Sequence, residues 1–100
     1  MTEFIWSSKA QTDLAVILKF EVEQRTPNLA LRRLFHINKA IDRLAIWPEF
    51  GHATTKKNVR VLYAPLAKCY IFYRIENVHT ILIARLQADL TRGLRPRSDF

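Results

Sequence analysis

The first part of the chain places apolar residues in the periods of one strand and one helix. Residues 3–6 form a short apolar run with aromatic and β-branched members, and Ser7-Ser8 follows it as a typical helix N-cap. The next apolar residues recur at helical spacing and share one face: Ala10, Leu14, Ile17, Leu18 and Val22. This segment therefore predicts an N-terminal strand followed directly by an amphipathic helix.

Thr26-Pro27 predicts the start of a second helix, because threonine is a favourable N-cap and proline is tolerated at the first helical position. The apolar residues of this helix repeat over two heptads: Ala30, Leu34, Ile37, Ile41 and Leu44. Two amphipathic helices joined by a few residues predict an antiparallel hairpin. Since neither helix can bury its apolar stripe alone, we expect a sheet to cover the hairpin.

The rest of the chain predicts that sheet. Pro48 and Gly51 end the second helix in a turn, and a polar segment then leads to three segments with strand composition: 59–64, 69–75 and 78–86. The middle segment is almost continuously apolar or aromatic, as expected for a central strand covered on both faces. Glu76-Asn77 predicts a tight turn before the last strand. The predicted fold is therefore α+β, with an N-terminal strand, a helical hairpin and then a three-stranded antiparallel meander (β-α-α-β-β-β).

The composition narrows the class of protein. One hundred residues with 49% hydrophobic and 25% charged side chains predict one domain over residues 1–100, with a basic C-terminal tail from about residue 87. The apolar runs fall short of the roughly 20 residues that span a bilayer. The N-terminus also lacks the basic and apolar regions of a secretory signal. We therefore expect a cytoplasmic protein with no membrane partner.

Basic charge gathers in the second half of the chain. Residues 1–55 carry seven basic and six acidic side chains, whereas residues 56–100 carry nine basic and three acidic ones. A half-chain with such an excess of basic residues usually binds an anionic partner, either nucleic acid or an acidic protein segment. The competing interpretation is that the charge serves solubility alone.

No metal site and no cofactor is expected. His36, His52 and His79 lack the paired spacing of metal ligands. Cys69 lies in the most apolar segment, where a free cysteine is usually a small buried hydrophobe. The chain has only two glycines, so it cannot form a glycine-rich phosphate loop.

Three arginines interrupt the predicted strands, one in each: Arg60, Arg74 and Arg85. An arginine within a strand must reach solvent or an anionic partner. If the hairpin covers one face of the sheet, we expect all three on the other face, with Lys56 and Lys57 arriving from the preceding loop. Guanidinium groups gathered in this way suit phosphate or carboxylate. The competing interpretation pairs the arginines with acids such as Glu76 and Asp89.

Several pieces of the sequence occur in a characteristic order and spacing over most of the chain: Ala10-x-x-Asp13-Leu14-x-x-Ile17, Ile41-x-x-Leu44-x-x-x-Pro48-x-x-Gly51, Arg60, Tyr70-Ile71-Phe72-Tyr73 and Ile81-Leu82-Ile83-Ala84-Arg85. In this arrangement the chain resembles the RelE/ParE superfamily of toxins of type II toxin-antitoxin systems, with the ParE branch the most similar. The resemblance implies a small twisted antiparallel sheet with the hairpin packed on it. It also implies a cognate antitoxin, ParD-like or RelB-like, that neutralises the toxin in a hetero-oligomer.

The superfamily implies two different activities. ParE-like members poison DNA gyrase by trapping its cleaved DNA complex, with no known catalysis of their own. RelE-like members are ribosome-dependent endoribonucleases that cut mRNA in the A site. RNA cleavage needs a base, an acid and cationic stabilisation, and RelE-like toxins commonly carry tyrosine or histidine just after the final strand.

The end of this chain favours the ParE branch. No histidine follows His79 and no tyrosine follows Tyr73, whereas Asp89 and Leu90 resemble the Asp-containing end of many ParE sequences. One departure is Arg85, where ParE-like chains often have histidine. We therefore expect a gyrase inhibitor without catalytic residues. The alternative is an mRNA endoribonuclease, which would use Lys56, Lys57, Arg60, Arg74 and Arg85.

Two binding surfaces complete the expectation. Charge alone nominates the residues that contact the target: Arg60, Arg74, Arg85, Arg92, Arg95 and Arg97. The antitoxin is expected at an apolar groove on the hairpin or at a sheet edge, anchored by Trp6, Phe20, Phe35 and Trp47. The competing interpretation buries these four side chains in the chain's own core. A third functional class, a non-catalytic nucleic-acid-binding module or an inactive relative, also stays open.

Overall fold

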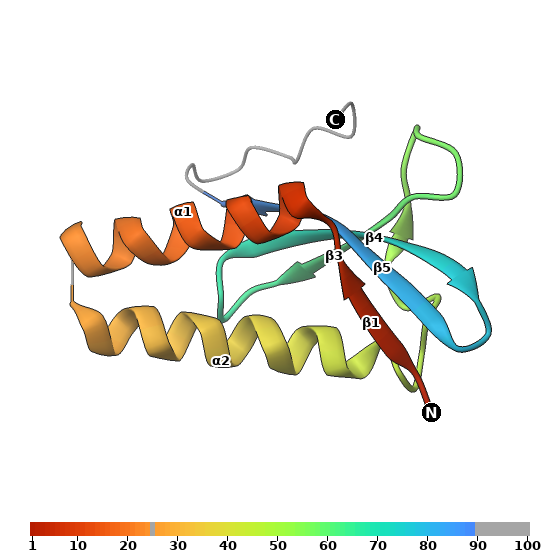
Figure 1. Cartoon of the computed structure of the whole chain (residues 1–100), viewed down its shortest axis with the longest axis horizontal. Helices are drawn as coiled ribbons and strands as arrows, with labels where there is room; N and C mark the ends of the chain where they lie inside the picture. Colours follow the sequence, from red (N-terminus) through yellow and green to blue (C-terminus); the bar gives the residue numbers. More distant parts are fainter. Residues whose placement is uncertain (25, 90–100) are drawn as a thin grey trace.

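The fold combines a curved sheet with a pair of helices (Figure 1). The computed structural model describes residues 1–24 and 26–89. Its elements in chain order are β1 (Glu3–Trp6), α1 (Ser8–Gln24), α2 (Pro27–Arg43), β2 (His52–Ala53), β3 (Arg60–Ala64), β4 (Cys69–Asn77) and β5 (Thr80–Ala88).

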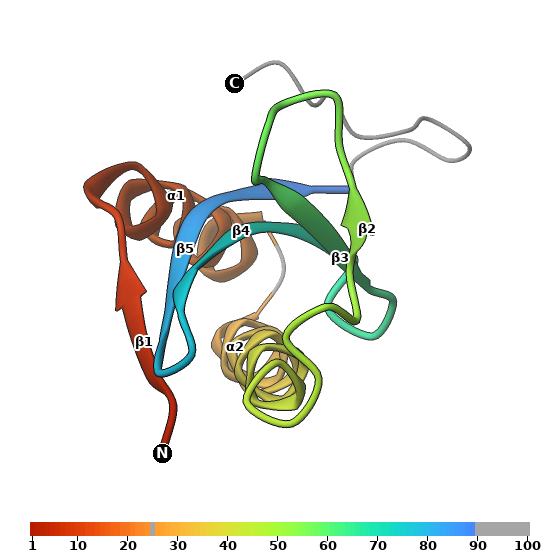
Figure 2. The ribbon, with the colours of Figure 1, turned by 90° about the vertical axis from the view of Figure 1, so that its right-hand side faces the viewer.

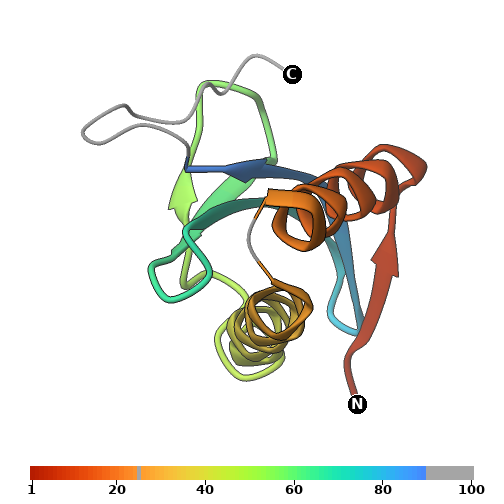
Figure 3. The same cartoon turned by 90° about the vertical axis from the view of Figure 1, so that its left-hand side faces the viewer.

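The sheet has the strand order β1-β5-β4-β3-β2. β1 lies parallel to β5, and all other neighbours are antiparallel. Viewed along the helices, the sheet curves around α2, while α1 lies beside β5 (Figures 2 and 3). The predicted α+β order and the antiparallel meander of β3, β4 and β5 are confirmed. The sequence did not predict the parallel position of β1 or the two-residue strand β2.

Both predicted helix starts are confirmed by their caps. The backbone N–H of Ala10 donates to Ser7 Oγ (3.0 Å), and that of Leu29 donates to Thr26 Oγ1 (3.2 Å). Thr26 has extended backbone angles and Pro27 occupies the first turn of α2. These side chains satisfy N–H groups that have no partner within the helix.

The turn between β4 and β5 differs from the prediction. β4 continues through Glu76-Asn77, so the chain reverses at Val78 and His79 instead. The side-chain oxygen of Asn77 accepts the backbone N–H of His79 (2.8 Å), which closes the turn two residues later than expected.

One core joins both helices to one face of the sheet. Its fully buried members include Ile37 and Leu44 from the second helix and its end, and Ile71, Tyr73 and Ile83 from the central strands. α1 adds Ala10 and Ile17. β4 lies in the middle of the sheet, as predicted, but the two helices pack on only one of its faces.

A β-bulge decides which face Arg85 occupies. Phe72 lies opposite Arg85, but the next β4 residue, Tyr73, lies opposite Ile83, so Ala84 is an extra residue on β5. Before the bulge the odd-numbered residues of β5 point into the core. The bulge reverses this alternation, and Arg85 therefore lies on the face directed away from α2, which we call the open face.

Candidate functional site

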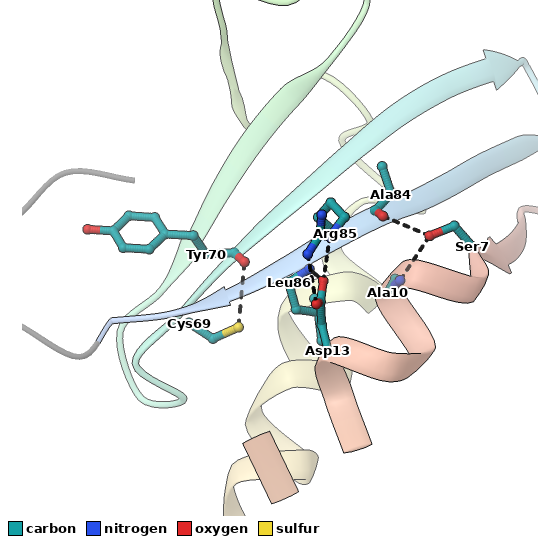
Figure 4. Close-up of polar contacts among 8 residues, drawn as sticks. All are labelled: Ser7, Ala10, Asp13, Cys69, Tyr70, Ala84, Arg85 and Leu86. Atoms are coloured by element: carbon teal, nitrogen blue, oxygen red, sulfur yellow. Dashed lines mark hydrogen bonds and ion pairs between the residues drawn. The ribbon is translucent and has the colours of Figure 1, made fainter. Parts of the chain in front are cut away.

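Beyond the end of β1, the start of α1 lies against the edge of β5 (Figure 4). β1 pairs with only the first half of β5, so the backbone edge beyond it has no neighbouring strand. Ser7 Oγ donates to the carbonyl oxygen of Ala84 (2.7 Å), and the backbone N–H of Leu86 donates to Asp13 Oδ2 (2.9 Å). Two side chains thus satisfy backbone groups that a further strand would otherwise pair.

Asp13 also neutralises Arg85. Arg85 donates from Nε to Asp13 Oδ2 (2.8 Å) and from Nη2 to Oδ1 (3.0 Å), and the two side chains are 33% and 16% exposed. The hydrogen bond to Asp13 raises the pKa of Arg85 above its ordinary value. Arg85 is therefore a charge-compensated clamp between β5 and α1.

Arg60 does not share the open face, which corrects the expectation that all three strand arginines gather there. It lies opposite Tyr73, a core residue, at the start of β3. Its guanidinium donates to two backbone carbonyl oxygens in the turn after α2, Gly51 O and Glu49 O (both 3.1 Å). The register of β3 puts Arg60 on the core side of the sheet. Because Arg60 is the first residue of β3, its side chain can extend past the end of the sheet to the turn after α2.

The same turn is held from the core by Tyr73. The Tyr73 hydroxyl donates to Pro48 O (2.6 Å) and accepts the backbone N–H of Gly51 (2.9 Å). A Cβ at Gly51 would lie 2.7 Å from Tyr73 Oη and 2.7 Å from Val61 O, so no larger residue fits there without movement. The Pro48-x-x-Gly51 piece of the sequence is thus a docking point for Tyr73 and Arg60.

Arg74 lies on the open face near the end of β4 and is exposed. It donates from Nε and Nη2 to the two carboxylate oxygens of Glu76 (2.8 and 3.1 Å). The hydrogen bond with Glu76 raises the pKa of Arg74, and that with Arg74 lowers the pKa of Glu76. The pairing with Glu76 was one of the two interpretations drawn from the sequence.

Asp89 ties the end of β5 to β3. The Tyr63 hydroxyl donates to Asp89 Oδ2 (2.8 Å), and this bond raises the pKa of Tyr63 to about 12. The Tyr63 ring lies 4.5 Å from that of Tyr70, whose side chain points away from α1 (Figure 4).

The three strand arginines therefore do not converge. Arg85 is clamped to α1, Arg74 is paired at the surface and Arg60 anchors a turn. Arg60 does lie close to the two lysines that were expected to join the arginines. Lys56, Lys57 and Arg60 line one hollow of about 290 Å³ between the 54–59 loop and the sheet, here called the basic pocket. Arg92, Arg95 and Arg97 lie outside the described residues.

Three of the four aromatic candidates are exposed. Phe20 on α1, Phe35 on α2 and Trp47 just after α2 are 49%, 56% and 64% exposed, so burial in the chain's own core is wrong for them. Trp6 is partly buried and packs against the core, so burial is right in part for that residue. Trp47 stacks on Phe50, with ring centroids 5.9 Å apart.

The sequence interpretation missed a buried ion pair, Glu21 with Arg33. Arg33 Nη1 lies 2.7 Å from Glu21 Oε1, and Arg33 also donates to the carbonyl oxygens of Ala67 and Lys68 in the β3–β4 turn. It thus joins both helices to the sheet. One signal was available, because Glu21 falls one turn after Ile17 on the buried face of α1, where a charge needs a partner.

The described residues contain no group of three or more His, Cys, Asp or Glu side chains placed to hold a metal. Cys69 is fully buried, and desolvation raises the pKa of its thiol to about 11, so the thiol is protonated at neutral pH. Within residues 1–24 and 26–89, neither helix has the length and apolarity of a membrane span.

Comparison with known proteins shows which family the chain belongs to. A solved structure described as the chromosomal ParDE toxin-antitoxin system from P. aeruginosa superposes with a TM-score of 0.76 at 23% sequence identity, covering 88% of this chain and 96% of that chain. No curated protein matches. The family model for the ParE toxin of the type II toxin-antitoxin system parDE matches residues 4–88. The chain therefore belongs to the ParE toxin family of type II toxin-antitoxin systems.

Proposed function

We propose that this ParE-family toxin acts in the cytoplasm by binding DNA gyrase and trapping its cleaved DNA complex, and that it has no catalytic activity of its own. The observation that carries the proposal is the dispersal of the five residues that an endoribonuclease would use. Lys56, Lys57 and Arg60 line the basic pocket, but Arg74 and Arg85 lie outside its lining and are each neutralised by a carboxylate.

Among the nominated target contacts, Arg74 is the best candidate in the described part of the chain. It is exposed, and its partner Glu76 is its neighbour on the same strand. A surface pair of this kind contributes little to stability, so the guanidinium can exchange Glu76 for a carboxylate of a partner protein at small cost. Arg60 and Arg85 would have to leave structural hydrogen bonds to do the same.

We propose that the antitoxin covers the outer side of the helical hairpin. α1 exposes Val16 and Phe20, and α2 exposes Leu31 and Phe35, each pair one helical turn apart. The ammonium group of Lys39 lies 5.7 Å from the centroid of the Phe35 ring and supplies a basic rim. Apolar stripes with basic rims suit an acidic amphipathic segment, which we expect from a ParD-like or RelB-like antitoxin in a hetero-oligomer.

The competing function is ribosome-dependent mRNA cleavage. The basic pocket supplies cations for it, but no histidine or tyrosine lines that pocket in the described residues to move a proton. The deciding experiment presents the purified chain to gyrase with supercoiled DNA and, separately, to ribosomes carrying mRNA. We expect trapped cleaved DNA in the first reaction and intact mRNA in the second. Cleavage of the mRNA in the A site, together with unaffected gyrase, would show that the chain is an endoribonuclease instead.

A further inference from the structure

The basic pocket has a lining of one sign of charge. Eight residues line it, and they include three cations and no carboxylate. Lys56, Lys57 and Asn58 come from the loop between β2 and β3, Arg60 from the start of β3 and Ile75 from β4. The nearest acid along β4, Glu76, is bound to Arg74. A concave site with this lining attracts an anion.

The loop that carries the lysines is held in a defined shape. The Thr54 hydroxyl lies 2.9 Å from Val59 O and accepts the backbone N–H of Lys56 (3.2 Å). The backbone N–H of Thr54 also donates to Val59 O (3.2 Å), and Asn58 adopts a left-handed φ of 65° that closes the turn. Val59 is buried and fixes the loop to the sheet. The loop backbone is therefore already ordered, so a ligand has little loop ordering to overcome.

In the described part of the chain, the guanidinium of Arg60 forms no ion pair with a carboxylate. The hydrogen bonds of its guanidinium go to two neutral carbonyl oxygens, Gly51 O and Glu49 O. The other two strand arginines differ, because Arg74 and Arg85 each bind a carboxylate. The carbonyl oxygens orient the Arg60 guanidinium without cancelling its charge, so the guanidinium still attracts an anion.

We propose that the basic pocket binds a phosphodiester group of a nucleic-acid backbone, with Lys57 and Arg60 as the principal contacts. The excess of basic residues between 56 and 100 supplies the long-range attraction to a polyanion. Lysine offers a point charge and arginine a planar fork, and together they match the tetrahedral oxygens of a phosphate. The inference goes beyond the proposed function, because it concerns direct contact with nucleic acid and holds or fails in the absence of gyrase.

The test is a titration of fluorescein-labelled oligonucleotides with the purified chain, followed by fluorescence anisotropy. One probe is a 20-base-pair DNA duplex and the other a single-stranded RNA, each measured from about 50 to about 200 mM salt. The variants are Lys57→Ala and Lys57→Glu. Their matched controls are Lys19→Ala and Lys19→Glu, which change the net charge equally at an exposed position on α1. Thermal unfolding confirms that all four variants are folded.

We expect both the wild type and Lys57→Ala to bind, with an affinity that falls as the salt concentration rises. Replacing Lys57 by alanine should reduce the magnitude of the slope of log K against log salt by about 1. The ratio of wild-type to Lys57→Ala affinity then falls about fourfold between the two salt concentrations. Lys19→Ala leaves the slope unchanged, and Lys57→Glu weakens binding more than Lys19→Glu. Binding of both probes, or of either one, agrees with a backbone phosphate site, and the preferred probe identifies the source of the phosphate.

Three results would overturn the inference. The first is no binding of either probe at about 50 mM salt. The second is equal effects at Lys57 and Lys19, which would mean that net charge alone governs association. The third is displacement of a bound oligonucleotide by a short polyglutamate peptide at equal charge concentration, which would identify the pocket as a carboxylate site for an acidic protein segment.

Discussion

Both carboxylate oxygens of Asp13 bind the guanidinium of Arg85, 72 positions further along the chain. One of them also accepts the backbone N–H of Leu86. A single side chain of α1 thus closes the edge of β5 and compensates a strand arginine. In this chain the helix piece that contains Asp13 supplies the acceptor, and the strand piece that ends in Arg85 supplies the donors.

Asp13→Ala is expected to lower the free energy of unfolding by about 1–3 kcal/mol, and by more than Arg85→Ala does. The aspartate variant leaves both the Arg85 guanidinium and the Leu86 N–H without their acceptor, whereas Arg85→Ala leaves Asp13 still bound to Leu86. Urea unfolding of both single variants and the double variant measures the losses and their coupling. Strictly additive losses would show that the two side chains do not interact.

Gly51→Ala is expected to destabilise the chain by about 1–3 kcal/mol, the usual range for overpacking a filled site. The added Cβ would meet Tyr73 Oη and Val61 O, both at 2.7 Å. Thermal unfolding measures the change. Tyr73→Phe is the companion variant: it removes the bonds to Pro48 O and Gly51 N and should cost a similar amount. An unchanged unfolding midpoint for Gly51→Ala would contradict this packing.

Alkaline pH is expected to weaken the fold through Cys69. Burial raises the pKa of its thiol from 9.0 to about 11, so the folded state keeps a proton that the unfolded chain releases. This contribution is complete below about pH 9 and is lost as the pH rises toward about 11. Urea unfolding between these pH values should show a smaller decline for Cys69→Ala than for the wild type. An identical decline would mean that the thiol does not titrate with unfolding.

Phe35→Ala is expected to separate antitoxin binding from stability. The side chain is 56% exposed, so its loss should change the free energy of unfolding by no more than about 0.5 kcal/mol. If Phe35 anchors the antitoxin, the affinity should fall about fivefold or more, because a buried aromatic anchor contributes above about 1 kcal/mol. Calorimetric titration with the cognate antitoxin measures it. Asn38→Ala, also at an exposed position on α2, is the control. Equal affinities for Phe35→Ala and the control would remove Phe35 from the interface.

The sequence predicted the elements well because their signals are local. Ser7, Thr26 and Pro27 act within one helical turn, and the apolar run of β4 reports its central place directly. The parallel pairing of β1 with β5 could not be predicted from local signals. It depends on contacts between residues near 3 and near 80, which no local period records.

The positions of the arginines were harder to predict. The face of Arg85 depends on a bulge at Ala84, and that of Arg60 depends on the register with Tyr73. One extra residue in a strand reverses every side chain after it, and nothing in the alternation of β5 marks that residue. The exposure of Phe20, Phe35 and Trp47 could not be read from an apolar composition either, because binding surfaces and cores use the same residue types.

The most direct test of the account is a cleavage assay with supercoiled plasmid, purified gyrase, ATP and this chain, in which linear DNA is scored after the enzyme is denatured. The account predicts linear DNA with gyrase bound to its ends, less of it with Arg74→Ala, and none once the antitoxin is added. Gyrase that supercoils normally and leaves no cleaved DNA, at toxin concentrations that stop growth, would contradict the account.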